Sequence, residues 1–140
     1  MSSVQDAITV AAPVERVWEA VVDFEARPRY SPRVKEARIL DGGPLREGSR
    51  IRLHVDRDRF TPVVVELRPR ERLALLVKGP GFHARHAYEL RAAGVATTVT
   101  MSAQLGGFLG TLAGRFMRGS VRRDLTDELE AIKRAAEASR

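Results

Sequence analysis

The sequence predicts an α+β fold in which the middle of the chain forms an antiparallel sheet and the flanking segments form helices. Over residues 34–105 apolar and polar residues alternate with a period of two, which is typical of strands. The connections between these stretches are short, and short connections join neighbouring strands in antiparallel order. Residues 13–23 and about 107–138 instead have the apolar spacing of amphipathic helices.

The N-terminal segment is expected to form a strand over residues 6–11 and then a helix over 13–23. Pro13 suits the first turn of a helix, because the N–H that proline lacks has no partner there. One helical face is apolar and consists of Val14, Val17, Trp18 and Val21. Trp18 lies in the middle of that face, so we expect it to pack on the sheet as a structural anchor rather than to contact a ligand.

Residues 24–33 cannot form one regular helix, because Pro28 and Pro32 interrupt it. We expect a short helical turn that carries Phe24 and Tyr30 inward.

Six strands are expected in the alternating region, separated by turns rich in glycine, proline and aspartate. Their expected ranges are 34–41, 48–56, 60–68, 72–78, 82–91 and 95–105. In the second strand Ile51, Leu53 and Val55 share one face, and arginines alternate with them. One face of the sheet is therefore expected to be covered and the other to be wet.

The last helix carries two apolar stripes that point in nearly opposite directions. The first comprises Leu109, Leu112, Ala113 and Phe116, and the second comprises Val121, Leu125, Leu129, Ile132 and Ala136. Each glycine in this segment weakens the helix by about 1 kcal/mol relative to alanine. We therefore expect a kinked helix, or two helices that meet near Gly119, with the second half packed on the sheet.

Segment 106–118 then has several alternative roles. It is expected to act as a gate over a cavity mouth, to contact a second subunit in a homodimer, or to lie on a lipid surface. The remaining alternative is that its glycines only allow close packing.

The first forty residues resemble a known family. The relevant stretches are Ile8-Thr-Val-Ala-Ala-Pro-Val-Glu-Arg-Val-Trp18-Glu-Ala-Val-Val-Asp-Phe24 and Tyr30-Ser-Pro-Arg-Val34. With the order of the elements, they resemble the START-like or Bet v 1-like (SRPBCC) superfamily, and within it the bacterial polyketide cyclase/dehydrase-type proteins. The resemblance covers essentially the whole chain, which we expect to be one ligand-binding domain over residues 1–140. It implies a helix-grip fold, a curved antiparallel β-sheet wrapped around a long C-terminal α-helix, with two short helices after the first strand.

The resemblance also implies an internal cavity. Members of the superfamily bind lipids, sterols, quinones, plant hormones or polyketides, and some catalyse cyclisation or dehydration. Our leading hypothesis is therefore binding, with transport or sequestration, of a small hydrophobic molecule such as a lipid, quinone or polyketide. The expected lining is Leu53, Val55, Val63, Val65, Leu75, His86, Tyr88, Val99 and Met101, closed by Phe24, Tyr30, Leu112 and Phe116.

His86 and Tyr88 are the candidates for chemistry, because they lie on the more apolar face of strand 82–91. A histidine titrates near neutral pH and could move a proton, and a tyrosine hydroxyl could hold a carbonyl or a phenol. The second hypothesis is thus a cyclase/dehydratase-type enzyme without a cofactor. The superfamily has no universal catalytic motif, so no catalytic residue can be carried over from it. For His86 and Tyr88 we favour hydrogen-bonded core residues over a catalytic pair, but we still expect both to contact the ligand.

Several function classes are not expected. The chain has no cysteine, which removes disulfides, thiolate zinc sites and cysteine nucleophiles. His83 and His86 point to opposite faces of one strand and His54 lies among arginines, so no metal site is expected. No serine nucleophile elbow or phosphate loop is present in the sequence.

The charge and the apolar runs also bear on partners. The formal net charge is +6, but the arginines are spread along the chain among acidic residues, so no nucleic-acid partner is expected. No export signal or membrane-spanning run is visible, so a cytoplasmic protein without integral membrane association is expected. A third hypothesis is a carrier that uses segment 106–118 on a membrane surface or a protein partner.

Overall fold

The computed structural model describes the backbone of residues 2–138 and the side chains of residues 3–110 and 119–138. Strand β1 (Ser2–Val10) leads into helix α1 (Val14–Val22), a 3₁₀ turn η1 (Phe24–Ala26) and the short helix α2 (Arg27–Tyr30). Seven strands follow, and helix α3 (Gly107–Ala138) ends the fold. The seven strands are β2 (Val34–Ile39), β3 (Ile51–Val55), β4 (Asp58–Phe60), β5 (Val63–Arg68), β6 (Arg72–Gly79), β7 (Phe82–Ala93) and β8 (Ala96–Gly106).

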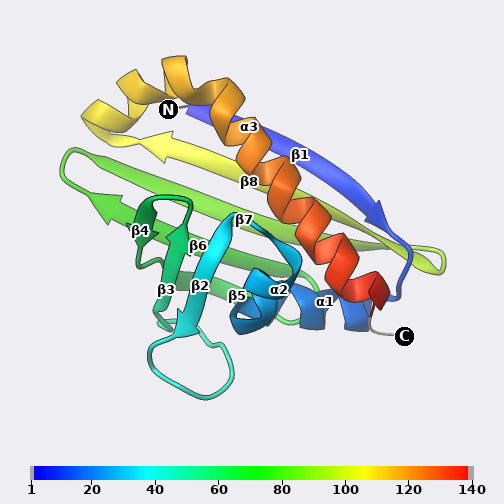
Figure 1. Ribbon diagram of the computed structural model, residues 1–140. Helices are drawn as coiled ribbons and strands as arrows, with labels where there is room; N and C mark the ends of the chain where they lie inside the picture. The colour runs from blue at the N-terminus through cyan, green and yellow to red at the C-terminus, as the bar shows by residue number, and fades with distance from the viewer. Residues whose placement is uncertain (1, 139–140) are drawn as a thin grey trace.

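The strands form two antiparallel sheets. The larger sheet has five strands in the order β1-β8-β7-β6-β5, and the smaller has three in the order β2-β3-β4. Helix α3 runs diagonally across one face of the larger sheet, and the smaller sheet lies beside the helix on the same side (Figure 1). This arrangement confirms the predicted α+β helix-grip fold.

The expected strand at 60–68 is wrong in one respect, because it is two strands that belong to different sheets. Strand β4 pairs with β3, whereas β5 pairs with β6. Pro62 lies between them, and it has no N–H to donate to a continuous ladder. Its carbonyl instead accepts the N–H of Ile51 at 3.0 Å. The chain therefore changes sheets at Pro62.

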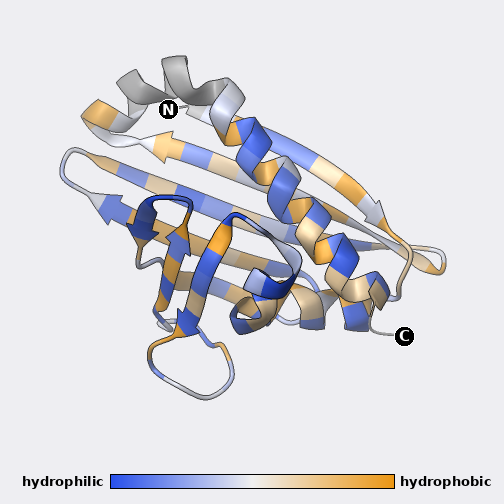
Figure 2. Cartoon of the chain, viewed as in Figure 1, coloured by the Kyte–Doolittle hydropathy of each residue, from blue (hydrophilic) through white to orange (hydrophobic). Residues whose placement is uncertain are grey.

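The core lies between α3, α1 and the larger sheet. The second apolar stripe of α3 is buried there, as expected, through Leu125, Leu129, Ile132 and Ala136. Figure 2 shows the alternation of apolar and polar residues along the strands that face this helix. From α1, Val17 and Val21 are fully buried, whereas Trp18 is only partly buried and packs against the edge of the core. Trp18 is thus a peripheral packing residue, and the two valines anchor the helix.

Helix α3 is one continuous helix from Gly107 to Ala138, so the alternative of two helices that meet near Gly119 is wrong. No proline interrupts the helix, and its backbone hydrogen bonds can therefore continue through the glycines. In Figure 1 the first turns run in a different direction from the part beyond Gly119. The side chains of Leu112 and Phe116, which we expected at the cavity mouth, lie outside the described residues. In the described part of the chain, no helix has the length and apolar character needed to cross a membrane.

Candidate ligand-binding cavity

A cavity of about 570 Å³ lies between α3 and the two sheets. The larger sheet contributes Leu75, Val77, Ala84, Met101 and Leu105 to its wall, and the smaller sheet contributes Val34, Leu53, Val55 and Phe60. Leu109, Val121 and Leu125 of α3 complete the apolar wall. The volume falls within the range of about 300–1,000 Å³ that is usual for small-molecule sites.

Most of the residues that we expected around a cavity are brought together here. Seven of them line it: Phe24, Leu53, Val55, Leu75, His86, Tyr88 and Met101. Leu53 and Val55 lie two apart on β3, as His86 and Tyr88 do on β7. The period of two therefore places both pairs on the cavity side.

Val63 and Val65 do not line the cavity, because the pairing of β5 with β6 shifts register between Val64 and Glu66. Such an irregularity changes which side chains point inward. Val64 is buried, whereas Val65 is 37% exposed. The simple alternation over residues 63–65 thus assigned the wrong valines to the inner face.

Val99 also lies outside the cavity wall, although it is fully buried. It is paired with Ile8 on one side and Leu90 on the other, and it belongs to the core cluster that contains Leu129 and Ile132. The docked half of α3 therefore fills the space that Val99 faces.

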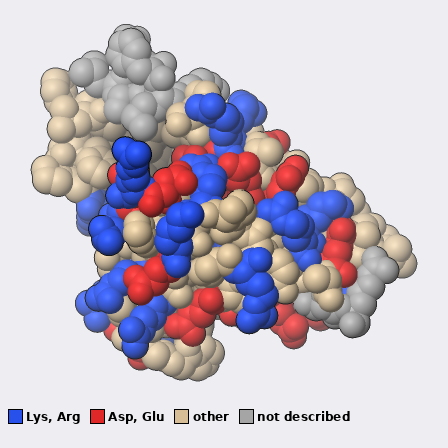
Figure 3. Space-filling view, in the orientation of Figure 1, with Lys and Arg blue, Asp and Glu red and all other residues tan. Residues whose placement is uncertain are grey.

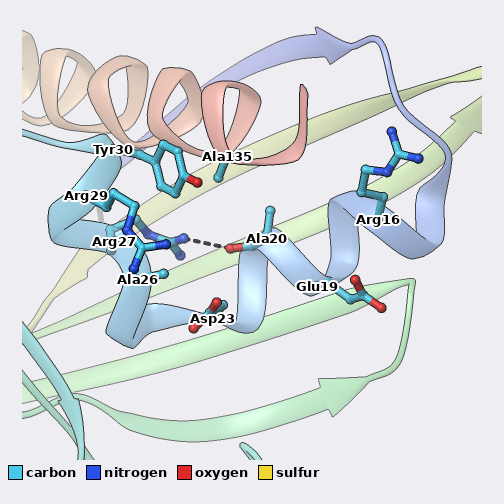
Figure 4. A pocket seen from close by; sticks show the side chains of 9 residues that line it. All are labelled: Arg16, Glu19, Ala20, Asp23, Ala26, Arg27, Arg29, Tyr30 and Ala135. Carbon is cyan, nitrogen blue, oxygen red and sulfur yellow. Dashed lines mark hydrogen bonds between the residues drawn. The ribbon is translucent and has the colours of Figure 1, made fainter. Parts of the chain in front are cut away.

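Tyr30 lines a separate surface groove between α1, α2 and α3. Figure 4 shows its ring beside Ala135 of α3, with Arg29 and Ala26 on the same groove. Tyr30 is not among the residues that line the cavity, in contrast to our expectation. Arg27 lines both the groove and the cavity and so separates them.

A buried polar cluster forms one end of the cavity. The guanidinium of Arg27 is buried and donates to the backbone oxygens of Ala20 and Val21 at 2.7 and 2.8 Å. Its Nε lies 3.2 Å from the Glu128 carboxylate, which also accepts a hydrogen bond of 2.7 Å from the Tyr88 hydroxyl. The ring of Phe24 lies under the guanidinium at 4.7 Å and contacts Tyr88 edge to face. Each group in this cluster is fixed by a partner.

The environment shifts the pKa of both candidate residues. Burial raises the pKa of Tyr88 well above its ordinary value of 10.0, and the negative charge of Glu128 adds to the effect. The Tyr88 hydroxyl therefore stays protonated. Burial lowers the pKa of His86 below 6.5, although the charges of Glu128 and Asp124 oppose this. His86 is thus a neutral imidazole at neutral pH. Among the side chains described, none forms a hydrogen bond with it, which leaves its ring available to a ligand.

A second cluster gathers around Arg33 at the edge of the cavity. Its guanidinium lies 2.7 Å from Asp56, 2.7 Å from Asp124 and 2.8 Å from Asp127. The hydrogen bonds from Arg33 lower the pKa of Asp56. These ion pairs link the loop before β2 to the turn after β3 and to helix α3.

Sequence reasoning missed Arg27, Arg33 and the acidic residues of α3. One signal was available for Glu128, which is three residues after Leu125 and four before Ile132 and hence lies on the apolar stripe. A carboxylate on a buried stripe needs a partner, and the sequence contains no pattern that identifies Arg27 as that partner.

The fold and the cavity together define a helix-grip domain of the START-like class, with its cavity between the sheets and the last helix. A family model described as "Polyketide cyclase / dehydrase and lipid transport" matches residues 1–137. The chain belongs to this family, as the resemblance of its first forty residues predicted.

Solved structures share the fold. A START superfamily protein from Mycobacterium smegmatis is 22% identical with a TM-score of 0.75, and the match covers 99% of each chain. The Zhui aromatase/cyclase from Streptomyces sp. R1128 is 22% identical with a TM-score of 0.77, covering 96% of this chain and 93% of that one.

A di-domain aromatase/cyclase, BexL from the BE-7585A biosynthetic pathway, is 20% identical with a TM-score of 0.77. That match covers 98% of this chain but only 47% of BexL, so the chain spans about half of that protein. At these identities the likeness shows the fold alone. A search of the curated proteins found no match.

Proposed function

We propose that this protein binds a small hydrophobic molecule, such as a lipid, quinone or polyketide, in the cavity between α3 and the two sheets, and that it carries or sequesters this molecule. The observation that supports this most directly is the apolar wall around a volume of about 570 Å³. Apolar surface that a ligand buries against such a wall contributes about 25 cal/mol per Å².

The polar side of the cavity orients the ligand. The apolar part of the molecule packs against Leu53, Leu75 and Met101. Its polar end faces the acidic residues of α3 that line the cavity, Asp124, Asp127 and Glu128. His86 supplies a neutral ring nitrogen that can accept a hydrogen bond from the ligand.

Binding of a neutral fluorescent probe, 1-N-phenylnaphthylamine, tests the location. Ala84 lies on the cavity wall and is buried, so Ala84→Trp fills part of the volume. Val95 is 93% exposed in a turn, so Val95→Trp adds the same side chain outside the cavity. We expect Ala84→Trp to lose most of the probe binding and Val95→Trp to keep it. A folded Ala84→Trp protein that binds the probe as the parent does would place the ligand elsewhere. Mass spectrometry of molecules extracted from the purified protein then identifies the ligand.

One observation favours a cyclase/dehydratase-type enzyme as a second candidate. His86 is uncharged at neutral pH and faces the cavity, so it can accept a proton from the carbon next to a ketone. Tyr88 is held by Glu128 and acts on a carbonyl only if that hydrogen bond is exchanged. Incubation with a linear poly-β-ketone separates the candidates: an enzyme yields a cyclised product lighter by one water, and His86→Asn abolishes it. Unchanged substrate, bound stoichiometrically, supports a binding protein.

A further inference from the structure

The wall of the cavity has the opposite charge balance to the chain as a whole. The chain carries a formal net charge of +6. Among the lining side chains that the structure describes, four carboxylates accompany only two guanidinium groups. These carboxylates belong to Asp58, Asp124, Asp127 and Glu128. Figure 3 shows acidic side chains set among basic ones on the face where α3 and the smaller sheet are in front.

Both guanidinium groups are already bound by protein acceptors. Arg33 is shared by Asp124, Asp127 and a third carboxylate, Asp56, so this cluster alone has an excess of two negative charges. Arg27 is held by Glu128 and by the backbone at the end of α1. A carboxylate on a ligand would therefore have to displace a protein carboxylate before it could reach either guanidinium.

Asp58 on β4 is different, because it forms no ion pair with any residue that the structure describes. It lines the cavity from the smaller sheet, whereas Asp124 and Asp127 line it from α3. The side chains of Asp124 and Asp127 are 52% and 51% exposed, which places them at the opening. A cation bound between these carboxylates can remain partly hydrated while an attached apolar group enters the cavity, which avoids much of the cost of burying a charge.

We propose that the cavity selects hydrophobic molecules whose polar end is a protonated amine over molecules that end in a carboxylate. This rests on the proposed function, since it names the ligand class of the same cavity. The ammonium N–H groups donate to the oxygens of Asp58 and the α3 aspartates, and the apolar group packs against the wall. A carboxylate in the same place meets like charges, which disfavours it.

Three ligands with one alkyl chain test the selection: dodecylamine, dodecanol and dodecanoate, each in competition with 1-N-phenylnaphthylamine at neutral pH and below its micellar concentration. We expect the amine to bind about three-fold or more tightly than dodecanoate, a modest ratio because the charges are half exposed. The alcohol should lie between them. Added salt should reduce the ratio, since ions screen exposed charges.

Matched variants locate the effect. Asp58→Asn should lower the ratio of amine to dodecanoate affinity at least two-fold, because a single charge at the opening is removed. Glu130→Gln makes the same charge change on α3, where Glu130 pairs with Arg134 and does not line the cavity. This control should leave the ratio unchanged. Asp127→Asn serves as the second variant if Asp58→Asn folds poorly, and it should lower the ratio in the same way.

The outcomes distinguish this inference from the proposed function. If dodecanol binds but dodecanoate binds as tightly as the amine, the charge selection is wrong and hydrophobic binding stands. Equal effects of Asp58→Asn and Glu130→Gln would attribute the preference to overall charge and would also overturn the inference. If none of the three competes and Ala84→Trp leaves the probe bound, the proposed function itself fails.

Discussion

The hydroxyl of Tyr88 donates a hydrogen bond of 2.7 Å to the carboxylate of Glu128, which joins strand β7 to helix α3 at the end of the cavity. The two residues are 40 positions apart in the chain. Glu128 also holds Arg27, so one carboxylate connects α3 to both the sheet and the segment after α1. The polar cluster therefore fixes how α3 lies across the sheet, and with it the shape of the cavity.

The first prediction concerns the tyrosine hydroxyl. Tyr88→Phe removes the hydrogen bond but keeps the ring that contacts Phe24. We expect the free energy of unfolding to fall by about 1–2 kcal/mol, since Glu128 loses a buried donor but retains Arg27. Tyr30→Phe is the control, because Tyr30 lies in the surface groove. Urea denaturation of both variants measures the difference, and equal stabilities would show that the Tyr88 hydroxyl contributes nothing.

The second prediction concerns the carboxylate. Glu128→Gln leaves the guanidinium of Arg27, which is only 3% exposed, without a counter-charge. Loss of one partner from a buried ion pair typically costs about 3–5 kcal/mol. Glu130→Gln on the same helix should cost less than about 1 kcal/mol, because its ion pair with Arg134 is exposed.

A double variant separates the ion pair from ordinary packing. Arg27→Met combined with Glu128→Gln removes both charges, so it should recover part of the stability that Glu128→Gln loses. Strictly additive losses in the two single variants and the double variant would mean that the two side chains do not interact.

The third prediction is a dependence of stability on pH that arises from His86. Its pKa in the folded state lies below its ordinary value, so the unfolded chain binds the proton more readily. Stability that is present above about pH 6.5 should therefore be lost as the pH falls through the unfolded-state value toward the lower folded-state value. The lowered pKa values of Asp6, Asp41, Asp56 and Glu66 also reduce stability in acid, but only below their ordinary values of 3.8 and 4.5.

Urea midpoints at about pH 7.5 and about pH 5.5 isolate the histidine from these carboxylates. We expect His86→Asn to lose less stability than the parent between the two pH values. The same substitution at His54, outside the cavity lining, is the control. If the pH dependence survives in His86→Asn and disappears in His54→Asn, it arises from His54, and our prediction is wrong.

The order of the elements could be predicted because each one has a strong local signal. Helix α3 was predicted from its apolar spacing and from the glycines at its start. The alternation on β3 and β7 was enough to place Leu53, Val55, His86 and Tyr88 on the cavity wall. The lining role of Val65 could not be assigned correctly, since the register shift on β5 depends on its partner strand and leaves the period of two in the sequence unchanged.

The polar cluster was beyond sequence reasoning for a different reason. Arg27 and Glu128 are 101 positions apart, and each residue type is normally exposed. Only the packing of α2 against α3 brings them together, and the resulting ion pair offsets the free-energy cost of burying the arginine. The charge balance of the cavity has the same origin, because Asp58 and Asp124 come from elements that meet only in the folded chain.

The last prediction concerns the start of α3, where segment 106–118 was expected to act as a gate. Gly107 has a φ of +81°, and a Cβ there would lie 2.8 Å from the oxygen of Gly81 and 3.0 Å from the Cα of Phe82. Both neighbours are backbone atoms, and the N–H of Leu109 donates to that same oxygen at 2.8 Å. Gly107→Ala therefore strains the backbone and pushes the helix start away from the turn between β6 and β7.

Gly119 supplies the opposite case within the same helix. Apart from its chain neighbours and the backbone of its own helix, no atom among the described side chains and backbone lies within 4 Å of a Cβ built at Gly119, so we expect Gly119→Ala to act mainly through the better helix propensity of alanine. We expect it to stabilise the protein by up to about 1 kcal/mol, and Gly107→Ala to destabilise it by about 1–3 kcal/mol.

Hydrogen exchange at the Leu109 amide reports on the contact with Gly81. It should be faster in Gly107→Ala than in the parent, and bound 1-N-phenylnaphthylamine should slow it in the parent, since Leu109 lines the cavity. Strong protection of this amide in the ligand-free parent, unchanged by the probe, would show that the start of α3 is ordinary packed structure and not a gate.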